Sequence, residues 1–151
     1  MTATIERVLF NILVKDLTTS AAFYRQLAGF KQIYTSDWYV VLAAPGRDSV
    51  ALGLIDQVSQ YTPRAAGGLP AGSYLTLGVD DVYAAYEKAR EMGVDLIEEP
   101  RPLDYGQTRA LLRDPNGVVI DISTPTDQLA PRVATEAEAE ADVSGKGRAA
   151  A

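Results

Sequence analysis

The feature that most constrains the fold of this 151-residue chain is an order of elements that occurs twice. Alternating and periodic apolar residues predict a strand, a helix and three further strands, in the ranges 6–14, 15–30, 30–35, 37–44 and 49–55. The same order is predicted again in the ranges 73–79, 80–93, 94–100, 106–113 and 118–124. Val14 corresponds to Val79 and Gly29 to Gly93, so the offset is nearly constant. Such self-similarity indicates a duplicated βαβββ unit.

We therefore predict an α+β fold made of two βαβββ modules, with one domain over residues 1–126. Module one covers 5–56 and module two covers 73–126. Residues 57–72 are rich in proline and glycine and are expected to form the linker. Residues 127–151 are polar, alanine-rich and without aromatics, and they predict a disordered tail, although TEAEAEA is compatible with a short helix.

Both predicted helices have recognisable ends. Asp16 or Thr18 is suited to cap the first helix, and Gly29 is expected to end it. Asp80 and Asp81 are placed to cap the second helix, which should stop at Gly93. Each helix has an apolar stripe, and each stripe is expected to cover one face of a sheet.

Composition excludes several classes of function. The chain has no histidine, the commonest general base and transition-metal ligand, and no cysteine for disulfides or thiolate sites. Its formal net charge of -6 gives no electrostatic footprint for nucleic acid, whereas a cationic small molecule is compatible with it. No apolar run reaches the length of a transmembrane helix and no signal peptide is evident, so a cytoplasmic protein is expected.

The doubled pattern contains VKDLTTSAAFYRQLAGFKQIY in the first module and VDDVYAAYEKAREMGVDLIEEP with DPNGVVIDI in the second. These segments resemble the vicinal oxygen chelate superfamily, which includes glyoxalase I, extradiol dioxygenases and bleomycin-resistance proteins. The resemblance covers roughly residues 5–126 and depends on the order and spacing of modest motifs. It implies that each module forms a cupped sheet and that two modules face each other around a cavity.

In metal-dependent members of that superfamily, four strands each direct one ligand into the cup, usually histidine, glutamine or glutamate. The corresponding positions in this sequence are Leu9, Gly53, Tyr74 and Asp121. Leucine and glycine side chains have no donor atom, and one carboxylate with one phenol does not complete a coordination shell. The resemblance therefore implies a site that has lost its metal and needs no cofactor.

Strand alternation assigns the two faces of each sheet. One set is apolar and is expected to lie under the helices: Val8, Phe10, Ile12, Val14, Leu52, Leu54, Leu75, Leu77, Ile120 and Ile122. The opposite set is mixed and is expected to line the cup: Leu9, Asn11, Gly53, Tyr74, Thr76, Asp121 and Ser123.

Asp121 is a carboxylate within an apolar strand, which is costly unless the carboxylate is used or paired. It is a candidate acceptor for a bound molecule, a candidate general base, or a partner of Arg109 or of a backbone group. Tyr74 either lines the cavity or only packs. Asn11 either lines the cup or bonds to backbone.

Two further segments are candidates for ligand contact. Trp38 and Tyr39 are adjacent in a predicted strand, so one is expected to face the cavity and the other to pack beneath it. Tyr105, Gln107 and Arg109 flank a glycine, where a mobile loop would close over a ligand or an ordinary strand would begin.

These observations favour a metal-free small-molecule-binding protein, similar to the bleomycin-resistance branch and expected to be a homodimer. An antibiotic or an aromatic metabolite is one candidate ligand. The alternatives are a metal-independent isomerase or cyclase with Asp121 as base, and a metal-dependent lyase or dioxygenase if the four positions are misassigned.

Overall fold

The computed structural model describes residues 2–131 of the chain. Module one contains β1 (Leu9–Val14), α1 (Leu17–Ala28), β2 (Lys31–Thr35), β3 (Tyr39–Ala44) and β4 (Arg47–Asp56). Module two contains β5 (Leu75–Gly78), α2 (Val82–Glu91), β6 (Asp95–Pro102), β7 (Gln107–Arg113) and β8 (Val119–Pro125). Two short 3₁₀ helices, η1 (Arg64–Ala66) and η2 (Thr126–Gln128), lie outside the sheets. The predicted α+β fold of two βαβββ modules is confirmed.

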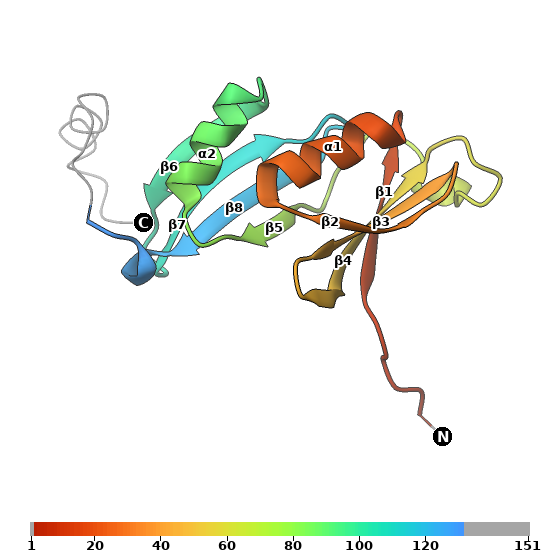
Figure 1. Ribbon diagram of the computed structural model, residues 1–151, viewed down its shortest axis with the longest axis horizontal. Coiled ribbons are helices and arrows are strands. Elements are labelled where there is room, and N and C mark those ends of the chain that lie inside the picture. The colour runs from red at the N-terminus through yellow and green to blue at the C-terminus, as the bar shows by residue number, and fades with distance from the viewer. Residues whose placement is uncertain (1, 132–151) are drawn as a thin grey trace.

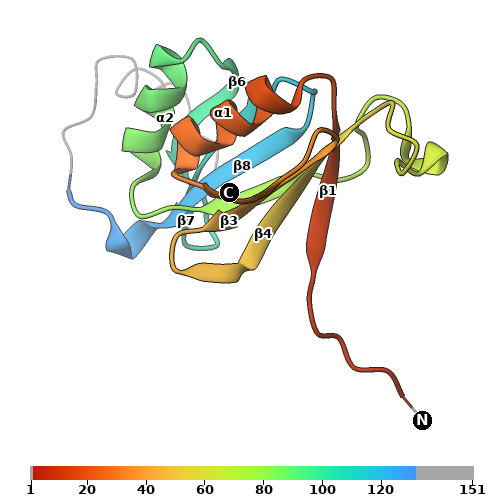
Figure 2. The same ribbon diagram turned by 45° about the vertical axis from the view of Figure 1, so that its right-hand side comes forward.

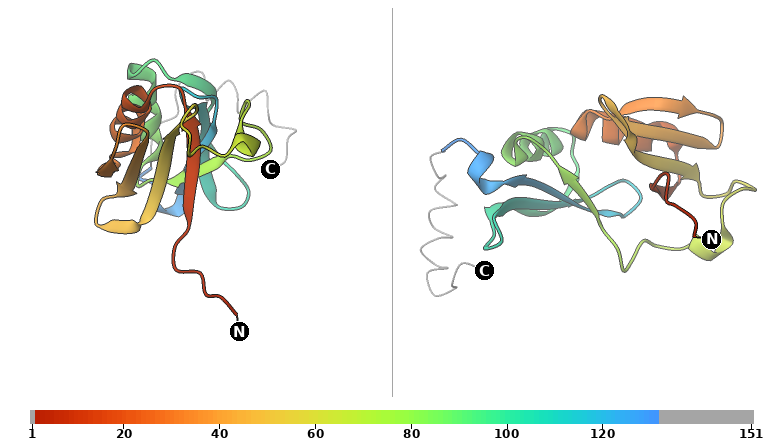
Figure 3. Two further views of the ribbon diagram at one scale, coloured as in Figure 1. Left: turned by 90° about the vertical axis from the view of Figure 1, so that its right-hand side faces the viewer. Right: turned by 90° about the horizontal axis from the view of Figure 1, so that it is seen from below.

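The two sheets have the same strand order, β1-β4-β3-β2 and β5-β8-β7-β6. In each sheet the first and last strands of the module pair in parallel, and the other pairs are antiparallel. The modules lie side by side, with both helices on one side of the molecule (Figure 1). The opposite faces of the two sheets are left without a covering helix (Figure 3).

Local sequence signals determine the helix boundaries. The side chain of Asp16 accepts hydrogen bonds from the backbone N–H groups of Thr18 and Thr19, so Asp16 rather than Thr18 is the cap of α1. Asp81 caps α2 in the same way. The chain leaves α1 through Gly29, whose φ of 71° favours glycine.

A continuous hydrophobic core joins the modules beneath the two helices. Tyr24 from α1 and Val82 from α2 are completely buried in it, together with Leu54, Ile120 and Ile122 from the sheets. The helices also contact each other. The modules therefore behave as one packed unit rather than as two independent domains.

The expected burial of Val8 and Phe10 under a helix is wrong, since 74% of Val8 and 42% of Phe10 is exposed. Helix α1 makes most of its sheet contacts with β2, β3 and β4, and β1 is an edge strand, so the start of β1 and the residue before it stay exposed. The N-terminal segment extends away from the body of the molecule (Figure 2). Ile12 and Val14, nearer the end of β1, are buried as predicted.

The tail was expected to begin at residue 127. Instead, η2 spans Thr126–Gln128 and Leu129 packs against the core, so the ordered fold extends slightly beyond that boundary. The residues around Leu129 are mostly polar, so the sequence pattern did not indicate that Leu129 packs against the core. The remainder of the predicted tail, 132–151, lies outside the described residues.

Candidate functional site

The uncovered face of module one contains an aromatic cluster. Trp38 and Tyr39 stack with ring centroids 5.4 Å apart, and Tyr61 from the linker lies 4.5 Å from Trp38. Tyr34 lies 6.3 Å from Tyr39. We call Tyr34, Trp38, Tyr39 and Tyr61 the aromatic cluster. Such a group offers flat surface and phenolic hydroxyls to a planar or cationic molecule.

The prediction that Trp38 and Tyr39 point to opposite faces is wrong. Strand alternation applies only within a strand, and β3 begins at Tyr39. Trp38 precedes it in a bend in which Ser36 accepts hydrogen bonds from the backbone N–H groups of Trp38 and Tyr39. This bend brings both rings to the same side.

Gly53 lies between the side chains of Asn11 and Tyr39. The Tyr39 hydroxyl donates a 2.6 Å hydrogen bond to Asn11 Oδ1, and a Cβ on Gly53 would collide with both partners. Asn11 therefore lies on the cup face rather than bonding to backbone. At Gly53, the position that the family resemblance assigns to a metal ligand, the space is occupied by a hydrogen-bonded amide and phenol.

Replacing Gly53 by alanine is expected to lower the free energy of unfolding by about 1 kcal/mol, because the added methyl displaces the Tyr39–Asn11 hydrogen bond. Urea denaturation measures the change. Gly78→Ala is a matched control, since Gly78 lies at the end of β5 and a Cβ there meets nothing within 4 Å. In an Asn11→Ala background the Gly53→Ala change should be milder; an equal penalty in both backgrounds would contradict the contact.

The uncovered face of module two is polar instead of aromatic. We call Thr76, Glu98, Arg109, Asp121 and Ser123 the polar cluster. Strand register places them on one face, because Thr76 lies opposite Asp121, Arg109 opposite Ser123, and Glu98 and Asp121 both opposite Leu111. Arg109 Nη2 lies 3.8 Å from Glu98 Oε2, and Glu98 also pairs with Arg101.

Asp121 is only 6% exposed. Its burial raises the pKa of the carboxyl above the ordinary value of 3.8, while Arg109 and the hydroxyls of Thr76 and Ser123 oppose the increase. Its Oδ1 atom has no hydrogen-bond partner. The expected pairing of Asp121 with Arg109 or with a backbone group therefore does not satisfy this oxygen.

The raised pKa of Asp121 gives a pH-dependent prediction. An acid with a higher pKa in the folded state binds protons more tightly there, so its contribution to stability falls as the pH rises through that pKa. Asp121→Asn is expected to raise the free energy of unfolding by about 1 kcal/mol at neutral pH. The gain should vanish below pH 3.8.

Denaturation at neutral and acidic pH measures this effect, and the exposed Asp104→Asn is the control. If Asp121→Asn has the same stability as the unsubstituted protein at neutral pH, the buried Asp121 carboxylate does not destabilise the fold.

Three further predicted positions, Leu9, Tyr74 and Tyr105, belong to neither cluster. Leu9 is half-buried at the start of β1, whereas Tyr74, just before β5, is 61% exposed. Tyr105 is 60% exposed in a hairpin in which Leu103 N–H donates to Gln107 O at 2.7 Å. A tight hairpin that starts a strand is therefore observed there rather than an open loop.

Glu98, Tyr34 and Tyr61 are members of the two clusters that the sequence did not indicate. Register shifts in β6 bring Glu98 opposite Leu111, and no local pattern signals such shifts. Tyr61 belongs to the linker, and its tilted packing against Trp38 is a tertiary contact that local pattern does not signal.

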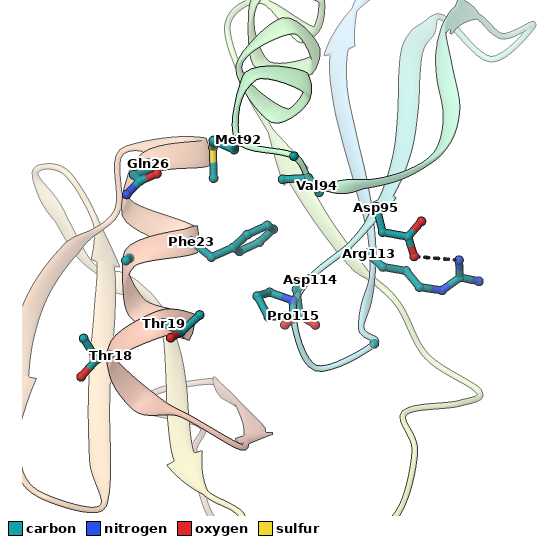
Figure 4. Close-up of a pocket in the computed structure, with 13 residues that line it drawn as sticks. Thr18, Thr19, Phe23, Gln26, Met92, Val94, Asp95, Arg113, Asp114 and Pro115 are labelled. Carbon is teal, nitrogen blue, oxygen red and sulfur yellow. Dashed lines mark ion pairs between the residues drawn. The ribbon is translucent and has the colours of Figure 1, made fainter.

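Two cavities lie away from the aromatic cluster and the polar cluster. One of about 810 Å³ is at the junction of the modules, between α1, the end of α2 and the turn 114–117 (Figure 4). Phe23, Met92, Val94 and Pro115 form its apolar wall, while Asp95 and Arg113 pair with each other. Another, of about 500 Å³, lies beside the start of α1. No predicted site residue lines either cavity, so both are separate from the two clusters.

The donor set of the four transferred positions does not fit a metal ion. Leu9 and Gly53 offer no ligand atom, and the space at Gly53 is occupied by Asn11 and Tyr39. Within residues 2–131, no group of three or more aspartate or glutamate side chains is arranged to hold an ion. The polar cluster supplies two carboxylates, each beside an arginine.

Two mixed sheets of orders β1-β4-β3-β2 and β5-β8-β7-β6, in each of which the first and last strands of the module pair in parallel, define a duplicated βαβββ protein. The model of the Glyoxalase/Bleomycin resistance protein/Dioxygenase superfamily matches residues 4–122, and the chain belongs to this family. Neither α-helix of the described part has the length and apolarity needed to traverse a bilayer.

Individual relatives agree with this assignment. The chain is 27% identical over 122 residues to a probable lactoylglutathione lyase of Vibrio parahaemolyticus, covering 77% of this chain and 88% of that protein. It is 29% identical over 121 residues to a lactoylglutathione lyase of Haemophilus influenzae, covering 76% and 90%. A family enzyme from Burkholderia phytofirmans has the same fold, with a TM-score of 0.64 at 24% identity, covering 78% and 96%.

Proposed function

We propose that this protein binds a small organic molecule without a metal, on the faces formed by the aromatic cluster and the polar cluster. One observation carries the proposal: the hydrogen-bonded side chains of Tyr39 and Asn11 occupy the space at Gly53, the position that the resemblance assigns to a metal ligand. An uncharged amide and phenol in that position favour hydrogen bonding to an organic guest over coordination of an ion.

The two clusters differ in chemistry, so they suit a small molecule that has both an aromatic or cationic ring and hydrogen-bonding groups. The aromatic cluster suits a planar or cationic ring, and the net charge of -6 is compatible with a cation. The polar cluster suits hydrogen-bonding groups. An antibiotic or another aromatic metabolite, sequestered in the cytoplasm, combines these features. A homodimer provides closure, because each face is uncovered in the single chain and apolar Val8, Phe10 and Val50 are exposed.

A second function has a specific observation in its favour. The pKa of Asp121 is raised by burial, which suits a general base that abstracts a proton from a bound substrate. Arg109, beside it, would stabilise the anion that forms. The protein would then be a metal-independent isomerase or cyclase.

A third function follows from the relatives named lactoylglutathione lyase, with which this chain would share a metal-dependent reaction. The side chains at Leu9 and Gly53 argue against this function, because they offer no atom that coordinates a metal ion. Stoichiometric manganese, nickel, zinc or iron in natively purified protein would favour this function and count against the proposal.

A thermal-shift screen with aromatic antibiotics and metabolites tests the proposed function. A guest that binds the folded state raises the melting temperature by mass action, by an amount that increases with its concentration. The control is a screen with Mn²⁺, Ni²⁺ and Zn²⁺, which should leave the melting temperature unchanged. With a guest in hand, Asp121→Asn separates the first two functions: a binding protein retains most of its affinity, whereas an enzyme loses turnover by orders of magnitude.

A further inference from the structure

Two buried side-chain atoms within residues 2–131 have no hydrogen-bond partner, namely Arg109 Nε and Asp121 Oδ1. One is a donor and the other is an acceptor. Arg109 lies opposite Ser123 in the β7–β8 ladder, and Asp121 lies two residues before Ser123, so both atoms belong to one face. Buried polar atoms are almost always paired, and an unpaired donor on the same face as an unpaired acceptor indicates a missing partner.

The two side chains do not satisfy each other. Arg109 influences the charge of Asp121, but no ion pair within 4.0 Å joins them. The terminal Nη2 of Arg109 lies instead 3.8 Å from Glu98 Oε2. Since Arg101 holds the other oxygen of Glu98, this chain of contacts restrains the arginine, while its buried Nε–H has no acceptor.

The charges around this pair select the kind of group that fits. A carboxylate guest would pair with Arg109 but would repel Asp121 and leave its Oδ1 unsatisfied. An ammonium guest would pair with Asp121 and leave Arg109 Nε without an acceptor. A neutral group that presents an N–H beside a carbonyl satisfies both atoms and adds no charge to a buried site.

We propose that Arg109 and Asp121 form a recognition pair for an amide-type group, such as a lactam, carboxamide or ureido group, of the guest. The Arg109 Nε–H donates to the carbonyl oxygen, and Asp121 Oδ1 accepts from the N–H. This proposal rests on the function proposed above, in which these faces bind a small molecule, and it specifies one chemical group of that molecule.

Matched probes test the pair directly. δ-Valerolactam carries both the N–H and the carbonyl, whereas N-methyl-δ-valerolactam retains the carbonyl and lacks the N–H. Titration of the full chain at millimolar probe concentration, followed by the ¹H–¹⁵N signals of the arginine Nε–H groups, should shift the Arg109 signal with δ-valerolactam. The N-methyl compound is expected to bind about tenfold or more weakly, because it leaves Asp121 Oδ1 unpaired.

Arg109→Lys retains the positive charge and removes the Nε–H, and it should abolish the preference for δ-valerolactam. Arg113→Lys, on the same strand and paired with Asp95, is the matched control and should preserve the preference. The melting temperature of each variant confirms that it is folded, and the comparison of the two lactams in the unsubstituted protein requires no variant at all.

Equal affinity for both lactams, or a preference that survives in Arg109→Lys, would overturn the recognition pair. A guest from the thermal-shift screen that binds while neither lactam does would also overturn it, and would leave the proposed binding function intact. Failure of both the screen and the lactams would remove both proposals.

Discussion

Replacing Asp114 by alanine is expected to lower the free energy of unfolding by about 3 kcal/mol or more, a large fraction of the stability of a domain of this size. Asp114 is only 4% exposed. It accepts hydrogen bonds from the Tyr24 hydroxyl at 2.7 Å and from the backbone N–H groups of Asn116 and Val118 at 2.8 and 2.9 Å. Alanine leaves these donors without a partner in a buried site.

The effect is large because Asp114 connects the modules. It lies in the Asp-Pro-Asn-Gly turn of module two, while Tyr24 is the fully buried centre of α1 in module one. Asn116 of the same turn donates to Ser20 Oγ at 3.0 Å and accepts from the Lys15 N–H at 3.1 Å. Loss of Asp114 therefore weakens both the turn and its attachment to α1.

Urea denaturation of Asp114→Ala, Tyr24→Phe and the exposed control Asp104→Ala measures this contribution. Tyr24→Phe removes one hydrogen bond and should cost about 1 to 2 kcal/mol. Asp104→Ala should be close to neutral. If Asp114→Ala unfolds at the urea concentration of the unsubstituted protein, the turn does not hold the modules together.

Replacing Trp38 by alanine is expected to weaken binding of a guest found in the thermal-shift screen by about tenfold or more, because buried tryptophan side chains dominate many binding sites. Trp38 stacks on Tyr39 and lies tilted against Tyr61, so its loss removes the ring contacts that join these two tyrosines in the aromatic cluster. Trp38→Phe preserves an aromatic face and should retain most of the affinity.

Trp38 is the only tryptophan of the chain, so its fluorescence reports guest binding without a label. Titration should change the emission of the unsubstituted protein, and calorimetry measures the affinity of the variants. Tyr83→Ala, which removes a half-buried aromatic ring from α2, is the control and should leave the affinity unchanged. A guest that binds Trp38→Ala as tightly as the unsubstituted protein would show that the aromatic cluster is not its site.

Much of the fold could be predicted from local periodicity and caps. Asp16, Gly29, Asp81 and Gly93 mark helix ends through interactions with residues only a few positions away. The predictions of burial were wrong where tertiary packing, rather than local pattern, determines whether a side chain is buried. Phe10 has the correct alternation for burial, but α1 packs over neighbouring strands and leaves Phe10 exposed.

Less of the candidate site could be predicted from the sequence, because its contacts join residues that are far apart in the chain. Asp121 stands out because it is charged among apolar neighbours, but its unpaired oxygen depends on where Arg109 and Glu98 point. The Asp-Pro-Asn-Gly segment was predicted as a turn and is one. Its attachment to Tyr24, 90 positions away in the chain, could not be inferred from local pattern.

The crowding around Gly53 also has an evolutionary consequence. A carboxylate or imidazole introduced at Gly53 would collide with Asn11 and Tyr39, so both neighbours would have to change before the new side chain fits. A donor would be needed as well at Leu9, the other position that the resemblance assigns to a ligand and whose side chain has no donor atom. Several mutually dependent substitutions therefore separate this sequence from an ion-coordinating one, and an intermediate with a side chain at Gly53 beside Asn11 and Tyr39 is destabilised by the collision.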